Sequence, residues 1–112
     1  MSNISLTSSD KVRNIEGTHV CLPKGFSSWK RYWTSESGRE WPDTCRISRC
    51  REPAAGGGHV NVRRKGKEVY IIPMCSSHNT PHNTAWMDAK SQTVAVFVDS
   101  GDTKGPEGVC WK

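Results

Sequence analysis

Large apolar side chains other than Trp and Tyr are scarce in this chain. Leu, Ile, Val and Phe together account for 18 of its 112 residues. This share, about 16%, lies below the roughly 20% under which a chain of high net charge tends to be disordered. The net charge is only +5, so disorder does not follow. Five Trp and two Tyr add apolar volume, but we expect a further stabilising element beside the hydrophobic core.

Long apolar runs are also missing, which excludes a transmembrane helix, and no membrane partner is expected. The N-terminus has no basic start followed by an apolar stretch, so it does not resemble a secretory signal, and a cytoplasmic protein is expected. In a reducing compartment, five cysteines indicate metal binding or catalysis rather than a disulfide framework. A secreted mature chain would weaken that inference.

The motifs of the common enzyme classes are absent. The chain has no Gly-x-Ser-x-Gly, no phosphate-binding Gly-x4-Gly-Lys loop, and no Gly-x-Gly-x-x-Gly that opens a helix. Its carboxylates are scattered over predicted loops. An ordinary hydrolase or cofactor enzyme is therefore not expected.

One helix is predicted near the N-terminal end of a single domain over residues 17–112. Ser27 or Ser28 can cap a helix that continues to Glu36, and Gly38 would end it. The rings of this helix recur at helical spacing and form one stripe, which is expected to pack on the core; a base-stacking platform is the alternative. Residues 1–16 lack apolar periodicity and are predicted to be a flexible tail.

A two-stranded hairpin is predicted in the middle of the chain. Residues 59–62 and 69–74 have strand character, and a tight turn containing Gly66 separates them. A short helix is expected to begin near Cys75 or Ser76. The β-branched run over residues 92–99 predicts a later strand.

Two pairs of metal-ligand residues flank this hairpin. Cys45-x4-Cys50 precedes it and Cys75-x2-His78 follows it, and three thiolates with one imidazole suit tetrahedral Zn²⁺. The order of a two-thiol turn, a hairpin and a ligand pair that opens a helix resembles the treble-clef zinc finger. The resemblance covers residues 45–83 and implies an α+β domain with a treble-clef-like centre, an N-terminal aromatic helix and an additional C-terminal strand. Unrelated buried thiols beside a surface histidine are the alternative.

His59 is a further candidate, because it begins the first hairpin strand. The segment from Gly58 through Asn79 is similar to the His-Asn-His (HNH) nuclease finger, a treble-clef derivative. That resemblance implies a metal-dependent nuclease in which His59 is the general base and His82 or Asn83 contacts a divalent cation. The segment departs from the family because Gly58 stands where an acidic residue is expected. His59 is otherwise an alternative zinc ligand or a core residue.

Cys21 and Cys110 remain outside the ligand set. A bridge between them would close a loop of about 90 residues and stabilise the fold by roughly 4 to 5 kcal/mol. In the cytosol we expect free thiols instead. The sequence leaves both states open.

Basic side chains gather around the predicted metal site, and a pI near 9.1 favours polyanionic partners. The sequence therefore predicts a non-catalytic, zinc-stabilised binding module whose leading partner is nucleic acid, with another protein as the second alternative and a solvated hairpin tip as the simplest explanation of the charge. The basic positions are Arg46, Arg49 and Arg51 before the hairpin and Arg63, Arg64, Lys65 and Lys67 at its turn.

Overall fold

An antiparallel sheet and one helix form the computed structural model, which describes residues 3–15, 21–80, 83–99, 101 and 103–104. The six-stranded sheet has the order β1-β7-β5-β4-β2-β6, and β3 pairs with β8 in a separate ribbon. The described chain is thus α+β or mostly β. The elements are β1 (Ile4–Ser5), β2 (Lys11–Asn14), β3 (Leu22–Pro23), α1 (Trp29–Ser37), β4 (Gly56–Val62), the 3₁₀ helix η2 (Arg63–Lys65), β5 (Val69–Met74), β6 (Met87–Asp88), β7 (Val94–Val98) and β8 (Thr103–Lys104).

Helix α1 has the ends that the sequence predicts. The Ser28 hydroxyl accepts a hydrogen bond from the backbone N–H of Arg31 at 3.1 Å, which satisfies one of the free donors of the first turn. Gly38 adopts the left-handed conformation (φ 68°), and its N–H donates to the Thr34 carbonyl at 3.1 Å. The predicted aromatic stripe of this helix is buried against the sheet.

The predicted hairpin is β4 paired with β5, and the later strand is β7. The hairpin is longer than predicted, because pairing already begins at Gly56 opposite Met74. Its connection is also less tight, since η2 intervenes before Gly66. Every residue of β5 is buried, which shows that both faces of this central strand are covered.

In place of the flexible tail expected over residues 1–16, the structure has strands β1 and β2. β1 pairs with β7, and β2 lies between β4 and β6. Leu6 and Val12 from this segment are fully buried in the core. The N-terminal residues that the structure describes are therefore part of the folded domain.

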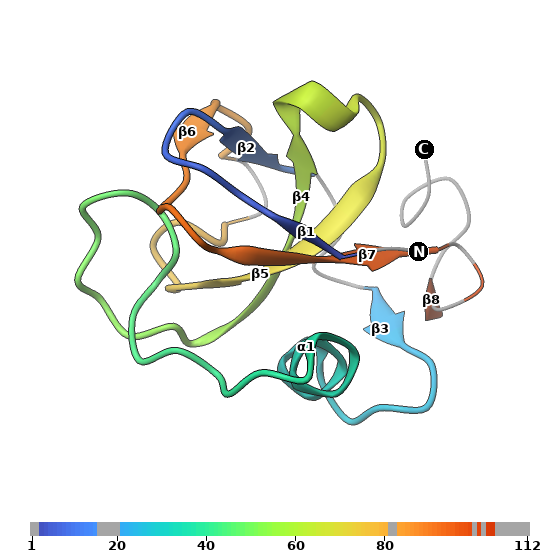
Figure 1. The fold of residues 1–112 in the computed structure, drawn as a ribbon. Helices are drawn as coiled ribbons and strands as arrows, with labels where there is room; N and C mark the ends of the chain where they lie inside the picture. The colour runs from blue at the N-terminus through green and yellow to red at the C-terminus, as the bar shows by residue number, and fades with distance from the viewer. Residues whose placement is uncertain (1–2, 16–20, 81–82, 100, 102, 105–112) are drawn as a thin grey trace.

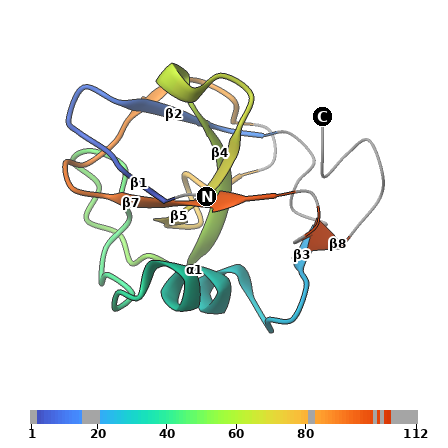
Figure 2. The same ribbon diagram turned by 45° about the vertical axis from the view of Figure 1, so that its right-hand side comes forward.

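The link between β1 and β2 requires the sheet to curl. Residues 6–10 join β1 to β2, which lies four places further along the sheet order. In a flat sheet that separation would be about 19 Å. The link is too compact to span it, because it contains a tight turn in which the Asp10 N–H donates to the Thr7 carbonyl at 3.0 Å. Figure 1 and Figure 2 show the curled sheet, with α1 packed below it and β2 and β6 side by side on the opposite side.

Two apolar clusters stabilise this arrangement. The first fills the inside of the curl and includes Tyr70, Ile72 and Met74 of β5. The second lies between α1 and the outer face of the sheet and includes Ile71 of β5. Alternate residues of β5 thus belong to the two clusters, because successive side chains of a strand point to opposite faces of the sheet.

Gly57 and Gly58 permit close packing on both faces of β4. A Cβ at Gly57 would lie 2.8 Å from the Cβ of Trp29 on α1, and one at Gly58 would lie 3.0 Å from Oδ1 of Asn79. Because a side chain at either position would overlap a neighbouring segment, these glycines let the helix and the Asn79 loop approach the sheet.

Candidate metal centre

Four metal-ligand side chains meet inside the curl of the sheet. Their ligand atoms, from Cys45, Cys50, Cys75 and His78, all lie within 4.8 Å of one another. The Sγ atoms of Cys50 and Cys75 are 3.8 Å apart. Nδ1 of His78 lies 3.2 Å from Sγ of Cys75 and 3.7 Å from Sγ of Cys45.

These separations suit a tetrahedral ion. Zinc–sulfur bonds of about 2.3 Å and zinc–nitrogen bonds of about 2.0 to 2.1 Å place two sulfur ligands about 3.8 Å apart, and a sulfur and a nitrogen ligand about 3.6 Å apart. The three cysteines are free thiols and are buried. The predicted ligand residues are therefore positioned to hold a metal ion.

The segment that carries Cys45 and Cys50, the first ligand loop, is held by hydrogen bonds to its backbone. The Cys45 N–H donates to the Glu52 carbonyl at 2.9 Å, and the Cys50 N–H donates to the Ile47 carbonyl at 3.1 Å. Arg49, between them, adopts a positive φ of 67°, which closes the turn. Nζ of Lys90 donates to the Cys50 carbonyl at 2.6 Å. The loop therefore presents both thiols from a fixed backbone.

The second ligand pair lies on a single turn rather than on the predicted short helix. The Asn79 N–H donates to the Cys75 carbonyl at 2.9 Å, but the helical pattern does not continue. Pro81 follows in the sequence and lacks the N–H that a helix needs. The treble-clef arrangement of knuckle, hairpin and helix is therefore not confirmed.

The surroundings of Cys45 and Cys75 shift the pKa values of their thiols in opposite directions. Burial raises the pKa of the Cys45 thiol to about 11. Burial also disfavours the Cys75 thiolate, but hydrogen bonds from the backbone N–H groups of His78 and Ser77, and from the thiols of Cys45 and Cys50, lower the pKa of Cys75 overall. A bound divalent cation would supply the positive charge that keeps all three sulfurs ionised in this buried place.

His59 lies on the other face of the sheet from the four ligand residues. Its ring contacts Trp29 of α1 edge to face, with centroids 4.5 Å apart, and the residue is 5% exposed. Its Nε2 is buried and has no hydrogen-bond partner among the residues that the structure describes. The alternative role as a zinc ligand does not fit this position, because β4 separates the ring from the thiols.

The burial of His59 predicts a pH dependence of stability. Burial lowers the pKa of His59 from 6.5 to about 4, so the folded state binds fewer protons than the unfolded state between these values. Its contribution is present above pH 6.5 and is lost as the pH falls toward 4, by up to about 3 kcal/mol. Urea unfolding of wild type and His59→Gln at several pH values measures this. The free energy of unfolding of the variant should fall less steeply; equal slopes for both proteins would contradict the prediction.

The two other predicted catalytic positions have different outcomes. His82 lies outside the described residues. Asn83 is half-buried, and its carbonyl accepts a hydrogen bond from Nδ2 of Asn14 at 2.9 Å. The same Nδ2 donates to the His78 carbonyl at 2.6 Å. Asn14 thus fixes the turn that carries the ligand residue His78. No sequence pattern identified Asn14, because this residue lies in the segment that was expected to be a tail.

The predicted basic residues fall into two groups. Arg46 is half-buried and donates to Oγ1 of Thr93, while Arg64 bonds Asp10 and Lys65 pairs with Glu68. The second group is exposed and makes no ion pair among the residues described; it consists of Arg49, Arg51, Arg63 and Lys67.

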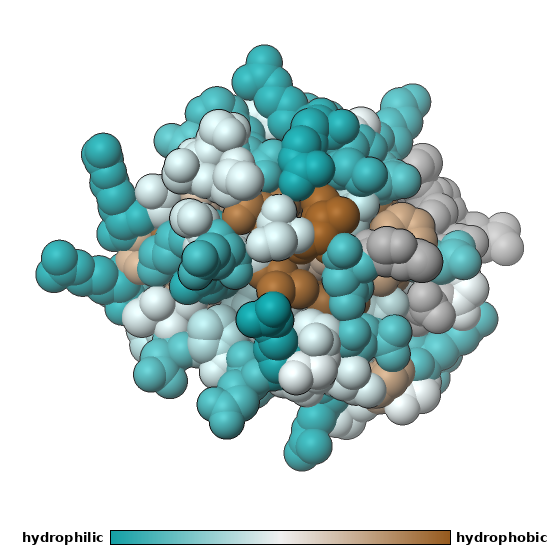
Figure 3. Space-filling view, in the orientation of Figure 1, coloured by the Kyte–Doolittle hydropathy of each residue, from teal (hydrophilic) through white to brown (hydrophobic). Residues whose placement is uncertain are grey.

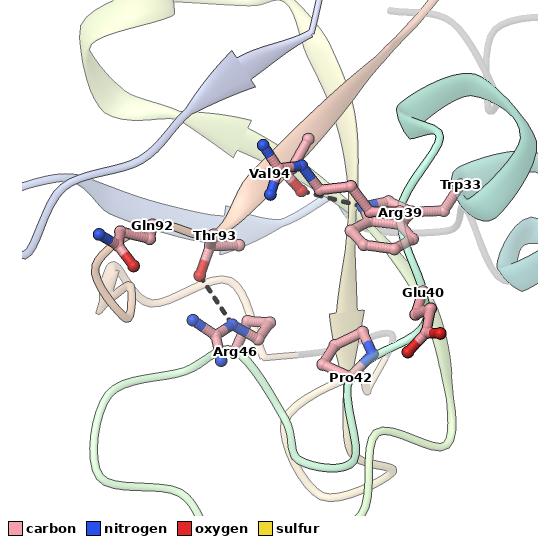
Figure 4. Close-up of a pocket in the computed structure, with 8 residues that line it drawn as sticks. All are labelled: Trp33, Arg39, Glu40, Pro42, Arg46, Gln92, Thr93 and Val94. Atoms are coloured by element: carbon pink, nitrogen blue, oxygen red, sulfur yellow. Dashed lines mark hydrogen bonds between the residues drawn. The ribbon is translucent and has the colours of Figure 1, made fainter.

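A pocket of about 210 Å³ lies between α1, the first ligand loop and β7. Figure 4 shows Arg46 held by Thr93 and the indole of Trp33 held by the Val94 carbonyl along its wall. Both side chains already form hydrogen bonds within the domain. The pocket is also smaller than the roughly 300 to 1,000 Å³ of typical small-molecule sites, so it does not define the function.

Cys21 is disulfide-bonded rather than the free thiol expected in a reducing compartment. Cys110 lies outside the described residues.

Among the described residues, none of the helices has the length and apolar character needed to cross a membrane. Comparisons with family models, with curated proteins and with solved structures found no significant match to this chain.

Proposed function

We propose that this chain is a non-catalytic module that is stabilised by a structural zinc ion and binds nucleic acid through a basic surface. The observation that carries the zinc proposal is the tetrahedral spacing of three buried thiols and one imidazole. Sulfur-rich sites of this geometry favour zinc over harder cations. Four protein ligands leave no open position for a reactive water, which favours a structural role for the ion.

The nucleic-acid proposal is supported by charge. Arg49, Arg51, Arg63 and Lys67 are exposed, make no ion pair within the described residues, and belong to a chain with a net charge of +5. Figure 3 shows hydrophilic side chains, in teal, over most of one face, with long ones projecting at several points of its outline. Phosphate groups are the ligands that such dispersed charges attract.

The nuclease alternative has no supporting observation in this geometry. A general base must reach the water that it activates and the substrate, whereas His59 is enclosed between β4 and α1. A protein partner likewise has no specific feature in its favour. We therefore retain the binding module alone.

Salt dependence tests the nucleic-acid proposal. The affinity of the zinc-loaded chain for a fluorescent duplex and a fluorescent single strand should fall steeply between low and moderate salt. The triple variant Arg49→Gln, Arg51→Gln, Lys67→Gln should bind more weakly, and its slope of log affinity against log salt should be shallower by about 0.7 to 0.9 for each phosphate that the variant no longer neutralises.

A matched triple variant, Lys24→Gln, Arg31→Gln, Arg39→Gln, removes the same charge from exposed positions at and around α1. It should bind almost as tightly as wild type. A wild-type chain that binds neither nucleic acid at low salt, or an equal weakening in both triple variants, would contradict the proposed basic surface.

A further inference from the structure

Trp86 is exposed, in contrast to the other tryptophans that the structure describes. Trp29 and Trp33 are buried, and Trp41 is half-buried; each donates its indole N–H to a backbone carbonyl. Trp86 is 37% exposed, and within the described residues its indole N–H has no hydrogen-bond partner. Packing and hydrogen bonding therefore account for three of the rings but not for Trp86.

Two guanidinium groups flank this ring. The Cζ atom of Arg13 lies 4.5 Å from the ring centroid, and that of Arg63 lies 5.8 Å from it. The pairing of Val12 with Met87 places Arg13 beside Trp86 at the end of the β2–β6 ladder. Neither arginine forms an ion pair with a carboxylate in the described part of the chain. The result is a partly exposed ring with the Arg13 guanidinium over it and the Arg63 guanidinium nearby, and neither positive charge is paired with a carboxylate in the described part of the chain.

The segment that contains Trp86 and β6 also lies between the two ends of the proposed basic surface. Arg63 comes from the hairpin connection, at the start of η2, while Arg49 comes from the first ligand loop and helps to lower the pKa of Asp88 on β6, after the larger effect of Lys11. The backbone N–H of Ser48, beside Arg49, donates to the Asp88 carbonyl at 2.8 Å. A chain of phosphates that contacts both ends would therefore pass over β6 and Trp86.

We propose that Trp86, with Arg13 and Arg63, is a stacking site for an unpaired base of single-stranded nucleic acid, whose phosphates the two arginines bind. This inference rests on the proposed function and specifies its ligand. Bases within a duplex are stacked on one another and cannot lie on an indole, whereas every unpaired base has a free aromatic face. Cation–π contacts at exposed sites are weak, so a base can displace a guanidinium and leave it free for phosphate.

Binding of single strands by Trp86 variants tests this site. The probes are fluorescent oligothymidylate and oligouridylate of about ten nucleotides and a duplex of the same length, titrated with zinc-loaded full-length chain. Trp86→Ala should lose about tenfold or more in affinity for the preferred single strand, while Trp86→Phe should stay within about threefold of wild type. Affinity for the duplex should be unchanged in both variants.

Further variants and an unfolding measurement test the role of the two arginines and check that the fold is intact. Arg13→Gln with Arg63→Gln should weaken single-strand binding and make the salt slope shallower by about 0.7 for each phosphate that is left without an arginine. Leu22→Ala, at the other large apolar side chain that is exposed among the described residues, should leave binding unchanged. Thermal unfolding of Trp86→Ala should match that of wild type.

The failures of the two proposals are distinguishable. If wild type binds single strands and Trp86→Ala binds them equally well, the stacking site is overturned and the basic surface stands. The same holds if Trp86→Ala weakens duplex and single-strand binding alike. If wild type binds no nucleic acid at low salt, the proposed function fails and the stacking site fails with it.

Discussion

Replacing Cys75 by Ser is expected to abolish stoichiometric zinc binding and to remove most of the free energy of unfolding. Sγ of Cys75 lies close to both Cys50 and His78, and the residue is 2% exposed. A serine hydroxyl is a poor zinc ligand and would be buried in an apolar cluster. Structural zinc supplies about 10 to 16 kcal/mol of apparent binding free energy in small domains, which is comparable to the total stability of about 5 to 15 kcal/mol of a folded protein.

Zinc content and urea unfolding of the purified variant measure this effect. Ser76→Ala is the matched control, because Ser76 is the exposed neighbour of Cys75; this variant should keep one zinc per chain and wild-type stability. A Cys75→Ser chain that unfolds cooperatively at the wild-type urea concentration would show that the ion is dispensable.

Replacing Trp33 by Ala is expected to destabilise the fold by about 3 to 5 kcal/mol. Trp33 is 3% exposed on α1, and its indole N–H donates to the Val94 carbonyl of β7 at 2.9 Å. Its ring also packs edge to face against Trp41, with centroids 5.5 Å apart. Truncation would leave a cavity between the helix and the sheet and an unpaired carbonyl beside it.

Trp33→Phe separates these contributions in the same unfolding experiment. This variant keeps an aromatic ring but loses the hydrogen bond, so it should cost roughly 1 to 3 kcal/mol. Both variants should retain zinc, because the ligand cluster lies on the other side of the sheet. Loss of zinc in Trp33→Ala while the chain stays folded would contradict the separation of the two apolar clusters.

The local elements of the fold were predictable because their signals are local. The cap at Ser28, the end at Gly38 and the aromatic spacing define α1 without reference to the rest of the chain. Strand character on either side of a turn likewise predicts the β4–β5 hairpin. The ligand set was predictable because its spacing forms two close pairs, and the fold brings these pairs together.

The N-terminal strands were not predictable from such signals. β1 has two residues, and β2 places the buried polar side chain of Asn14 two positions after Val12. Neither pattern indicates a strand, because pairing with β7 and β4, distant in sequence, is what stabilises them. The curl of the sheet follows from these pairings and was therefore also missed.

The face of β4 that His59 occupies could not be read from the sequence either. Alternation separates His59 from its neighbours Gly58 and Val60, but both faces of this strand are covered. Which face meets the thiols depends on where α1 packs. The helix lies against Gly57, and this contact places His59 under Trp29.

Native mass spectrometry, combined with circular dichroism before and after exhaustive chelation, tests whether a metal ion held by Cys45, Cys50, Cys75 and His78 stabilises the fold. We expect one zinc ion per chain, with Cys45, Cys50 and Cys75 all reduced, and loss of the cooperative unfolding transition once the ion is removed. A chain that remains fully folded without metal, or one in which two of these three sulfurs are joined in a disulfide, would contradict this expectation.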